Sequence, residues 1–189
     1  MVTKYDTYFI GGVAIVVYFL VDFISPENTI LQNLTECIGW TSTVCLASYA
    51  LFNKYLWRKW PICKFINRPY VGGIWSGNIH YNFNGVAGKK RVTVQIQQDF
   101  YNIKICLKTD INLSKSCTAE YCAEESKIFY VYKTDPHSRM KDINPVQYGA
   151  AQIVIDQNNL NKIRIEYWTD RRTKGYMDLK RVLNKKQRF

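Results

Sequence analysis

The chain has 189 residues, which leaves room for one domain of ordinary size once its apolar N-terminal third is set apart. Its net charge of +11 suits nucleic acid, anionic lipid head groups or a small phosphorylated ligand, and charge alone does not choose among them. Six cysteines without a C-x-x-C pair and only two histidines argue against a zinc site or a disulfide framework, so no metal and no cofactor is expected.

Two apolar stretches come first, residues 8–24 and 38–57. At about 1.5 Å per residue, the first just suffices to cross a hydrocarbon core of about 30 Å. The loop between them holds only acidic charges, whereas Lys54, Arg58 and Lys59 follow the second stretch. The positive-inside bias therefore predicts a two-helix transmembrane hairpin over residues 1–59, with a basic flank and with both chain ends cytoplasmic.

Small residues recur every four positions in the second stretch, at Gly39, Thr43 and Ala47. Such a face lets two helix backbones approach closely in a membrane. We expect this face of small residues to pair helices. The pattern fits pairing between subunits and pairing within one chain equally well.

From Gly72 onward, helical periodicity gives way to period-two alternation of apolar and polar residues. Eight runs follow this pattern: 73–83, 91–98, 102–109, 117–125, 127–133, 148–156, 162–168 and 175–182. One face of the sheet is apolar, and no helix remains to cover it, so the sheet is expected to close on itself. Residues 60–189 are therefore predicted to form an all-β, eight-stranded antiparallel up-and-down β-barrel whose interior side chains fill the lumen.

Alternate hairpins of such a barrel lie at opposite ends, and the four longer, basic connections should share one mouth. Cations pair with phosphate and aromatic faces stack on bases, so this rim is the candidate ligand-binding site. Its candidate residues are Tyr81, Lys90, Arg91, Tyr132, Arg139, Lys141, Trp168, Arg171, Arg172 and Lys174. The alternative is that charged loops at a free barrel end only confer solubility.

The first strand opens with Gly73-Ile74-Trp75, and Gly77 follows two residues after the tryptophan. The alternation points Trp75 inward, where it is predicted to plug the barrel end nearest the apolar stretches. Similar Gly-x-Trp openings occur in lipocalin-like barrels, which favours a packing role.

Two apolar stretches, the linker WPICKFINRP, the strand motif G-x-W-S-G and the closing motif GYMDLKR occur together here. In this combination the chain resembles the two-transmembrane, β-barrel effectors of bacterial cyclic-oligonucleotide-based anti-phage signalling (CBASS), which are associated with CD-NTases. The resemblance implies that the barrel binds a cyclic dinucleotide made by a cognate nucleotidyltransferase during phage infection. It further implies a ligand-induced homo-oligomer that disrupts the lipid bilayer of the bacterial inner membrane and kills the infected cell.

Several alternatives stay open. An enzyme is not expected, because the sequence has no G-x-S-x-G motif, no phosphate-binding glycine loop and no cysteine with a plausible histidine base. A carrier of an apolar molecule would need space in a lumen that is expected to be crowded. A static membrane adaptor, or a barrel that binds another small ligand or nucleic acid at the same rim, would share every feature above.

Overall fold

The computed structural model describes residues 4–24, 29–66, 68–83, 85–110, 112–136, 145–156 and 159–182, with the side chains of 4–10, 30, 31, 33 and 34 left aside. The chain divides into two compact units, Met1–Lys59 and Trp60–Phe189. Each unit has a buried apolar cluster of its own.

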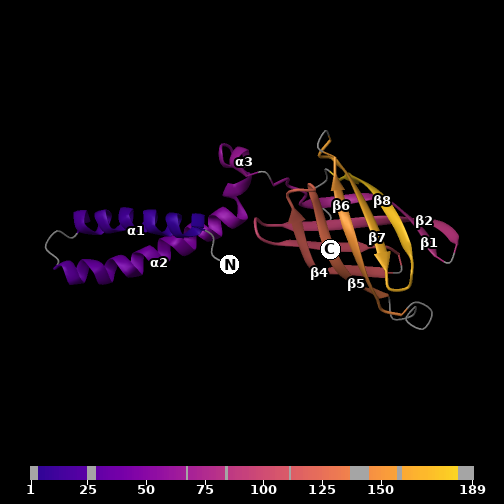
Figure 1. The fold of residues 1–189 in the computed structure, drawn as a ribbon, viewed down its shortest axis with the longest axis horizontal. Coiled ribbons are helices and arrows are strands. Elements are labelled where there is room, and N and C mark those ends of the chain that lie inside the picture. The colour runs from indigo at the N-terminus through magenta and orange to yellow at the C-terminus, as the bar shows by residue number, and fades with distance from the viewer. Residues whose placement is uncertain are drawn as a thin grey trace. The chain divides into compact units, whose positions relative to one another are not determined.

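The first unit is a pair of antiparallel helices, α1 (Lys4–Ile24) and α2 (Ile30–Lys54), which lie side by side in Figure 1. A capping box starts α2, because the backbone N–H of Thr29 donates to Gln32 Oε1 at 2.9 Å and Thr29 Oγ1 accepts from the Gln32 backbone. The buried contact between the helices is made by Val17, Val21 and Cys37. A short 3-10 helix, η1 (Leu56–Arg58), ends the unit.

The prediction of two transmembrane helices is wrong: among the described residues, no helix combines the length and the apolar character that crossing a membrane requires. In α1, the charge-free run between Asp6 and Asp22 falls short of the roughly 20 apolar residues of a typical span. In α2, polar residues such as Glu36 and Ser42 interrupt the apolar ones. These spans had also led us to expect a two-span protein of the bacterial inner membrane with a cytoplasmic N-terminus and barrel. This expected localisation is wrong for the same reason.

The predicted small-residue face of α2 lies away from α1. Gly39, Thr43 and Ala47 are exposed, and the Thr43 hydroxyl donates to the Gly39 carbonyl of its own helix at 3.1 Å. The contact with α1 uses a different face, where Cys37 Sγ lies 3.8 Å from the Ala14 carbonyl oxygen. Packing within the chain therefore does not use the predicted face, and its pairing between subunits stays a prediction.

The second unit begins with a short helix, α3 (Ile62–Phe65), and continues as eight strands. The strands are β1 (Gly73–Phe83), β2 (Val86–Gln98), β3 (Ile103–Lys108), β4 (Asn112–Cys122), β5 (Lys127–Pro136), β6 (Gln147–Ile155), β7 (Lys162–Thr169) and β8 (Lys174–Arg181). Every strand pairs antiparallel with the next, and β1 pairs with β8, so the sheet closes as Figure 1 shows. The predicted eight-stranded antiparallel up-and-down barrel is confirmed.

One end of the barrel interior is solidly filled. Trp75 is fully buried there, and its Nε1 donates to the Val71 carbonyl at 2.9 Å. The buried Gln98 side chain accepts from the Val71 N–H at 2.8 Å and donates to the Pro69 carbonyl at 3.0 Å. The Arg181 guanidinium lies 4.4 Å from the Trp75 ring centroid. These contacts hold residues 69–72 against the filled end, where the plug was predicted.

Candidate ligand-binding site

The opposite end of the barrel interior is hollow, with a cavity of about 330 Å³. Its size lies at the low end of the range of about 300–1,000 Å³ typical of small-molecule sites. Its walls come from the strand ends next to the β1–β2, β3–β4, β5–β6 and β7–β8 connections, as Phe83, Thr109, Thr134 and Thr173 show. The described strand ends next to the four connections thus share one mouth, as predicted, whereas the expectation of a lumen with little space fails at this end.

The floor of the cavity is apolar. Ile79 and Met177 line it, and the fully buried Ile153 and Ile165 belong to the core beneath. These residues follow from the alternation, because each occupies an inward position of its strand. The floor separates the hollow mouth from the end filled by Trp75.

Four tyrosines line the walls above this floor: Tyr81, Tyr130, Tyr132 and Tyr167. Burial raises the pKa of Tyr130 above its ordinary value, and burial, with the neighbouring Tyr167 and Asp170, raises the pKa of Tyr132. Burial, and then the nearby Tyr81, raise the pKa of Tyr167 to about 12. Tyr130, Tyr132 and Tyr167 are therefore neutral near pH 7. A phenol hydroxyl can both donate and accept a hydrogen bond.

One side of the cavity is rich in aliphatic hydroxyl groups. Ser114 and Thr134 are buried and hydrogen-bonded to each other at 2.7 Å between their oxygens. Ser116 Oγ accepts from the Ile105 N–H at 2.9 Å, and Thr173 also lines the cavity. Such groups suit the edges of bases and sugars, which present donors and acceptors in fixed directions.

Two cations complete the lining, and each lies beside an aromatic ring. Lys90 Nζ is 5.3 Å from the Tyr81 ring centroid, and the Arg171 guanidinium is 5.6 Å from that of Phe83. No Asp or Glu occurs among the described residues that line the cavity. The described lining thus carries two cationic side chains and no carboxylate, which favours an anionic ligand such as a phosphodiester.

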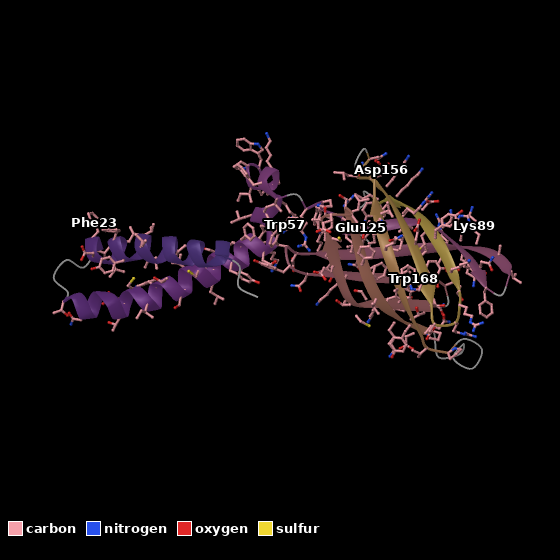
Figure 2. All side chains as sticks on the ribbon, in the orientation of Figure 1. Phe23, Trp57, Lys89, Glu125, Asp156 and Trp168 are labelled. Carbon is pink, nitrogen blue, oxygen red and sulfur yellow. The ribbon has the colours of Figure 1, made fainter. Side chains whose placement is uncertain are left out.

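The structure brings four of the ten predicted rim residues into this cavity: Tyr81, Lys90, Tyr132 and Arg171. Four others do not line it: Arg91, Trp168, Arg172 and Lys174. Arg91 occupies an exposed position next to Lys90. Trp168 is 51% exposed and occupies an outward position of β7; Figure 2 labels it. The remaining two, Arg139 and Lys141, lie outside the described residues.

Sequence reasoning missed several lining residues. Tyr130, Tyr167, Ser114 and Thr134 line the cavity but had not been named as candidates for the site. Their inward position at the strand ends next to the mouth was the available signal. Their depth relative to the floor was not, because it depends on how the strands are staggered.

A second cavity of about 560 Å³ lies between β3 and β4, where only Cys106, Leu107 and Lys108 pair with β4. Polar residues such as Gln95 and Lys104 line it, and none of its described lining residues is aromatic. The mouth cavity, which combines rings, hydroxyl groups and cations, is therefore the better candidate for a nucleotide ligand.

Comparison with known proteins agrees with this geometry. Residues 66–181, which include the whole barrel, match the family model described as Cap15, cyclic dinucleotide receptor domain. The chain belongs to this family, and this places it among the CBASS effectors that respond to a cyclic dinucleotide. Over 176 residues it is 28% identical to the CD-NTase-associated protein 15 of Staphylococcus schleiferi, an alignment that covers 92% of this chain and 94% of that relative. The predicted resemblance to the CD-NTase-associated effectors of CBASS is confirmed, whereas its two-transmembrane part is not.

Proposed function

We propose that the mouth cavity is the receptor site, and that it binds a cyclic dinucleotide made by a cognate CD-NTase. The observation that carries this proposal is the lining itself: four tyrosines and two cations surround a hollow without a described carboxylate, inside a domain of the cyclic dinucleotide receptor family. Lys90 and Arg171 pair with the ligand's phosphates, and the tyrosine rings stack on its bases.

Ligand binding then promotes assembly of the chains into a homo-oligomer. A cavity of about 330 Å³ is small for a two-nucleotide ring, so part of the bound ligand is expected to extend to the mouth. A second chain can contact it there. Assembly follows only if the ligand binds the assembled state more tightly than the single chain. We do not extend the proposal to disruption of the inner membrane, because the two spans on which that expectation depended are corrected above.

The site acts as a receptor and not as an enzyme in this proposal. No histidine, cysteine or carboxylate occurs among the described lining residues, so the cavity offers no evident general base or nucleophile other than its neutral hydroxyl groups and Lys90. His80 occupies an outward position of β1 and stacks on Tyr176 with ring centroids 4.8 Å apart.

Sedimentation of the full chain with a panel of cyclic dinucleotides tests the proposal. We expect one or a few of them to bind saturably and to increase the sedimenting mass, and matched linear dinucleotides to do neither. Single-stranded RNA is the comparison for a general nucleic-acid binder, whose affinity falls steeply with salt and tolerates many sequences. Absence of binding by every cyclic dinucleotide would contradict the proposed receptor function, and binding without a change in mass would contradict the assembly step.

A further inference from the structure

The interior of the barrel contains one ring of positions in which tyrosines alternate with small residues. Antiparallel pairing places each of these residues directly opposite the next one on the neighbouring strand. The pairs are Gly88–Tyr81, Tyr81–Gly175, Gly175–Tyr167, Tyr167–Ala151, Ala151–Tyr130 and Tyr130–Ala119. This tyrosine belt, as we name these seven residues, crosses seven strands at the level of the cavity. Two residues away from the Tyr130–Ala151 pair, Tyr132 of β5 lies opposite Gly149 of β6 in the same way.

Two of the glycines paired with tyrosines, Gly88 and Gly149, lie against the ring of their partner. A methyl group placed on Gly88 would overlap Cζ and Oη of Tyr81. One placed on Gly149 would lie 2.5 Å from both Cζ and Oη of Tyr132, well inside van der Waals contact. Each ring therefore occupies the volume that a side chain on its neighbour would need. The rings lie along the inner wall and leave the centre of the mouth open.

A ring held in this way has one side against the wall and the other toward the cavity. We propose that Gly88 and Gly149 are positioning residues that hold Tyr81 and Tyr132 as stacking platforms for the planar bases of the ligand, an inference that rests on the proposed function. Lys90 Nζ, 5.3 Å from the Tyr81 ring centroid, then stands beside a stacked base where it can reach the adjoining phosphate.

Gly88 offers the cleanest test of this arrangement. The nearest atoms to a methyl group added there all belong to the Tyr81 ring and hydroxyl, whereas at Gly149 the added group would also meet the backbone oxygen of Trp168. Gly88 lies within β2 and has no left-handed φ, so alanine suits its backbone. Gly88→Ala should therefore displace the Tyr81 ring into the cavity and leave the strands in place.

The first measurement needs no ligand. In NMR spectra of the full chain labelled at glycine, the α-protons of Gly88 should show the upfield shift that a ring lying over them causes. Tyr81→Ala should abolish this shift at Gly88 and keep it at Gly149, which lies under Tyr132. Unshifted Gly88 protons in the unsubstituted chain would overturn the proposal.

The second measurement is a double-mutant cycle in which calorimetry measures the Kd of each variant for a cyclic dinucleotide. Gly88→Ala and Tyr81→Ala should each raise the Kd about 5- to 150-fold, since stacking on an aromatic ring contributes about 1–3 kcal/mol per base. The double variant should bind no more weakly than Tyr81→Ala. Ala87→Val, which adds volume at an exposed position of the same strand, is the matched control and should bind like the unsubstituted chain.

The outcomes separate this inference from the proposed function. If the unsubstituted chain binds no cyclic dinucleotide, both fail. If it binds and Gly88→Ala binds equally well, or if the two substitutions act additively, only the positioning role is overturned. If Gly88→Ala does not fold, Tyr81→Leu replaces it, because this substitution removes the ring and requires no space over Gly88. An unchanged Kd for Tyr81→Leu would then overturn the positioning role.

Discussion

Replacing Lys90 with methionine should weaken cyclic dinucleotide binding far more than the same replacement at Lys89. Lys90 lines the cavity, whereas its neighbour Lys89 is exposed at the outer surface, as Figure 2 shows. Each substitution lowers the net charge of +11 by one, so the long-range attraction for an anion changes almost equally. The difference between the two variants therefore isolates the interaction inside the cavity.

The size of that difference follows from the hydrogen bond to phosphate that methionine cannot donate. A hydrogen bond to a charged group contributes about 1.5–3 kcal/mol, which corresponds to a rise in Kd of about 10- to 150-fold for Lys90→Met. The Kd is measured by calorimetry of the full chain near 0.15 M salt, where the Debye length is about 8 Å. Because salt at this concentration screens charges outside the cavity, Lys89→Met should change the Kd by no more than about 2-fold. Equal rises in Kd for the two variants, or an unchanged Kd for Lys90→Met, would refute the reasoning.

Three further predictions concern the filled end, the tyrosines and the outer wall. Gln98→Ala should lower the free energy of unfolding in urea by about 1–3 kcal/mol, because two buried backbone groups lose their partner, whereas the exposed Gln97→Ala should change it by about 0.5 kcal/mol or less. Tyr167, whose pKa is raised to about 12 from 10.0, contributes stability that is fully present below pH 10 and lost between pH 10 and 12. Between pH 10 and pH 12, the melting temperature of Tyr167→Phe should therefore fall less steeply than that of the unsubstituted chain. Trp168→Ala should leave the Kd for the ligand within about 2-fold by calorimetry, because this ring is exposed on the outer wall and does not line the cavity.

Each of these has a clear contrary result. Equal destabilisation by Gln98→Ala and Gln97→Ala would mean that the hydrogen bonds to residues 69–72 do not stabilise the barrel. An alkaline profile unaffected by Tyr167→Phe would mean that this phenol is not protected from ionisation by burial. A large decrease in affinity in Trp168→Ala would mean that the ligand contacts the outer wall, where Trp168 lies, and not only the cavity.

The barrel could be predicted because its signal is local. Alternation assigns each strand an inward and an outward face, and one apolar face without a covering helix requires closure. The prediction placed all eight strands and pointed Trp75 inward, where the structure finds it buried.

The errors in strand bounds have identifiable causes. In β4, the register shifts between Ser116 and Thr118, so the inward residues change from Ser114 and Ser116 to Ala119. A single alternating pattern cannot fit both halves, and only the second half was predicted as strand. In β2, the first residues include Gly88 and several cations, which are typical of a loop, yet they pair with β1 as far as Val86.

The site was harder to predict than the barrel. Rim cations were chosen for their place in the sequence, but adjacent residues of a strand face opposite sides, so Lys90 enters the cavity and Arg91 does not. The hollow itself depends on Gly88, Gly149 and their partner tyrosines, and this pairing requires the cross-strand register. The transmembrane assignment rested on apolar composition and gave too little weight to the polar residues within α2.

The central claim, that the hollow mouth receives the cyclic dinucleotide, is tested most directly by methyl NMR of the full chain during a ligand titration. The methyl signals of Met177 and Ile79, which form the cavity floor, should shift in proportion to saturation. Those of Val94, buried away from the cavity, should shift little. Binding that leaves Met177 and Ile79 unmoved, and instead shifts Ile103 beside the second cavity, would contradict the claim.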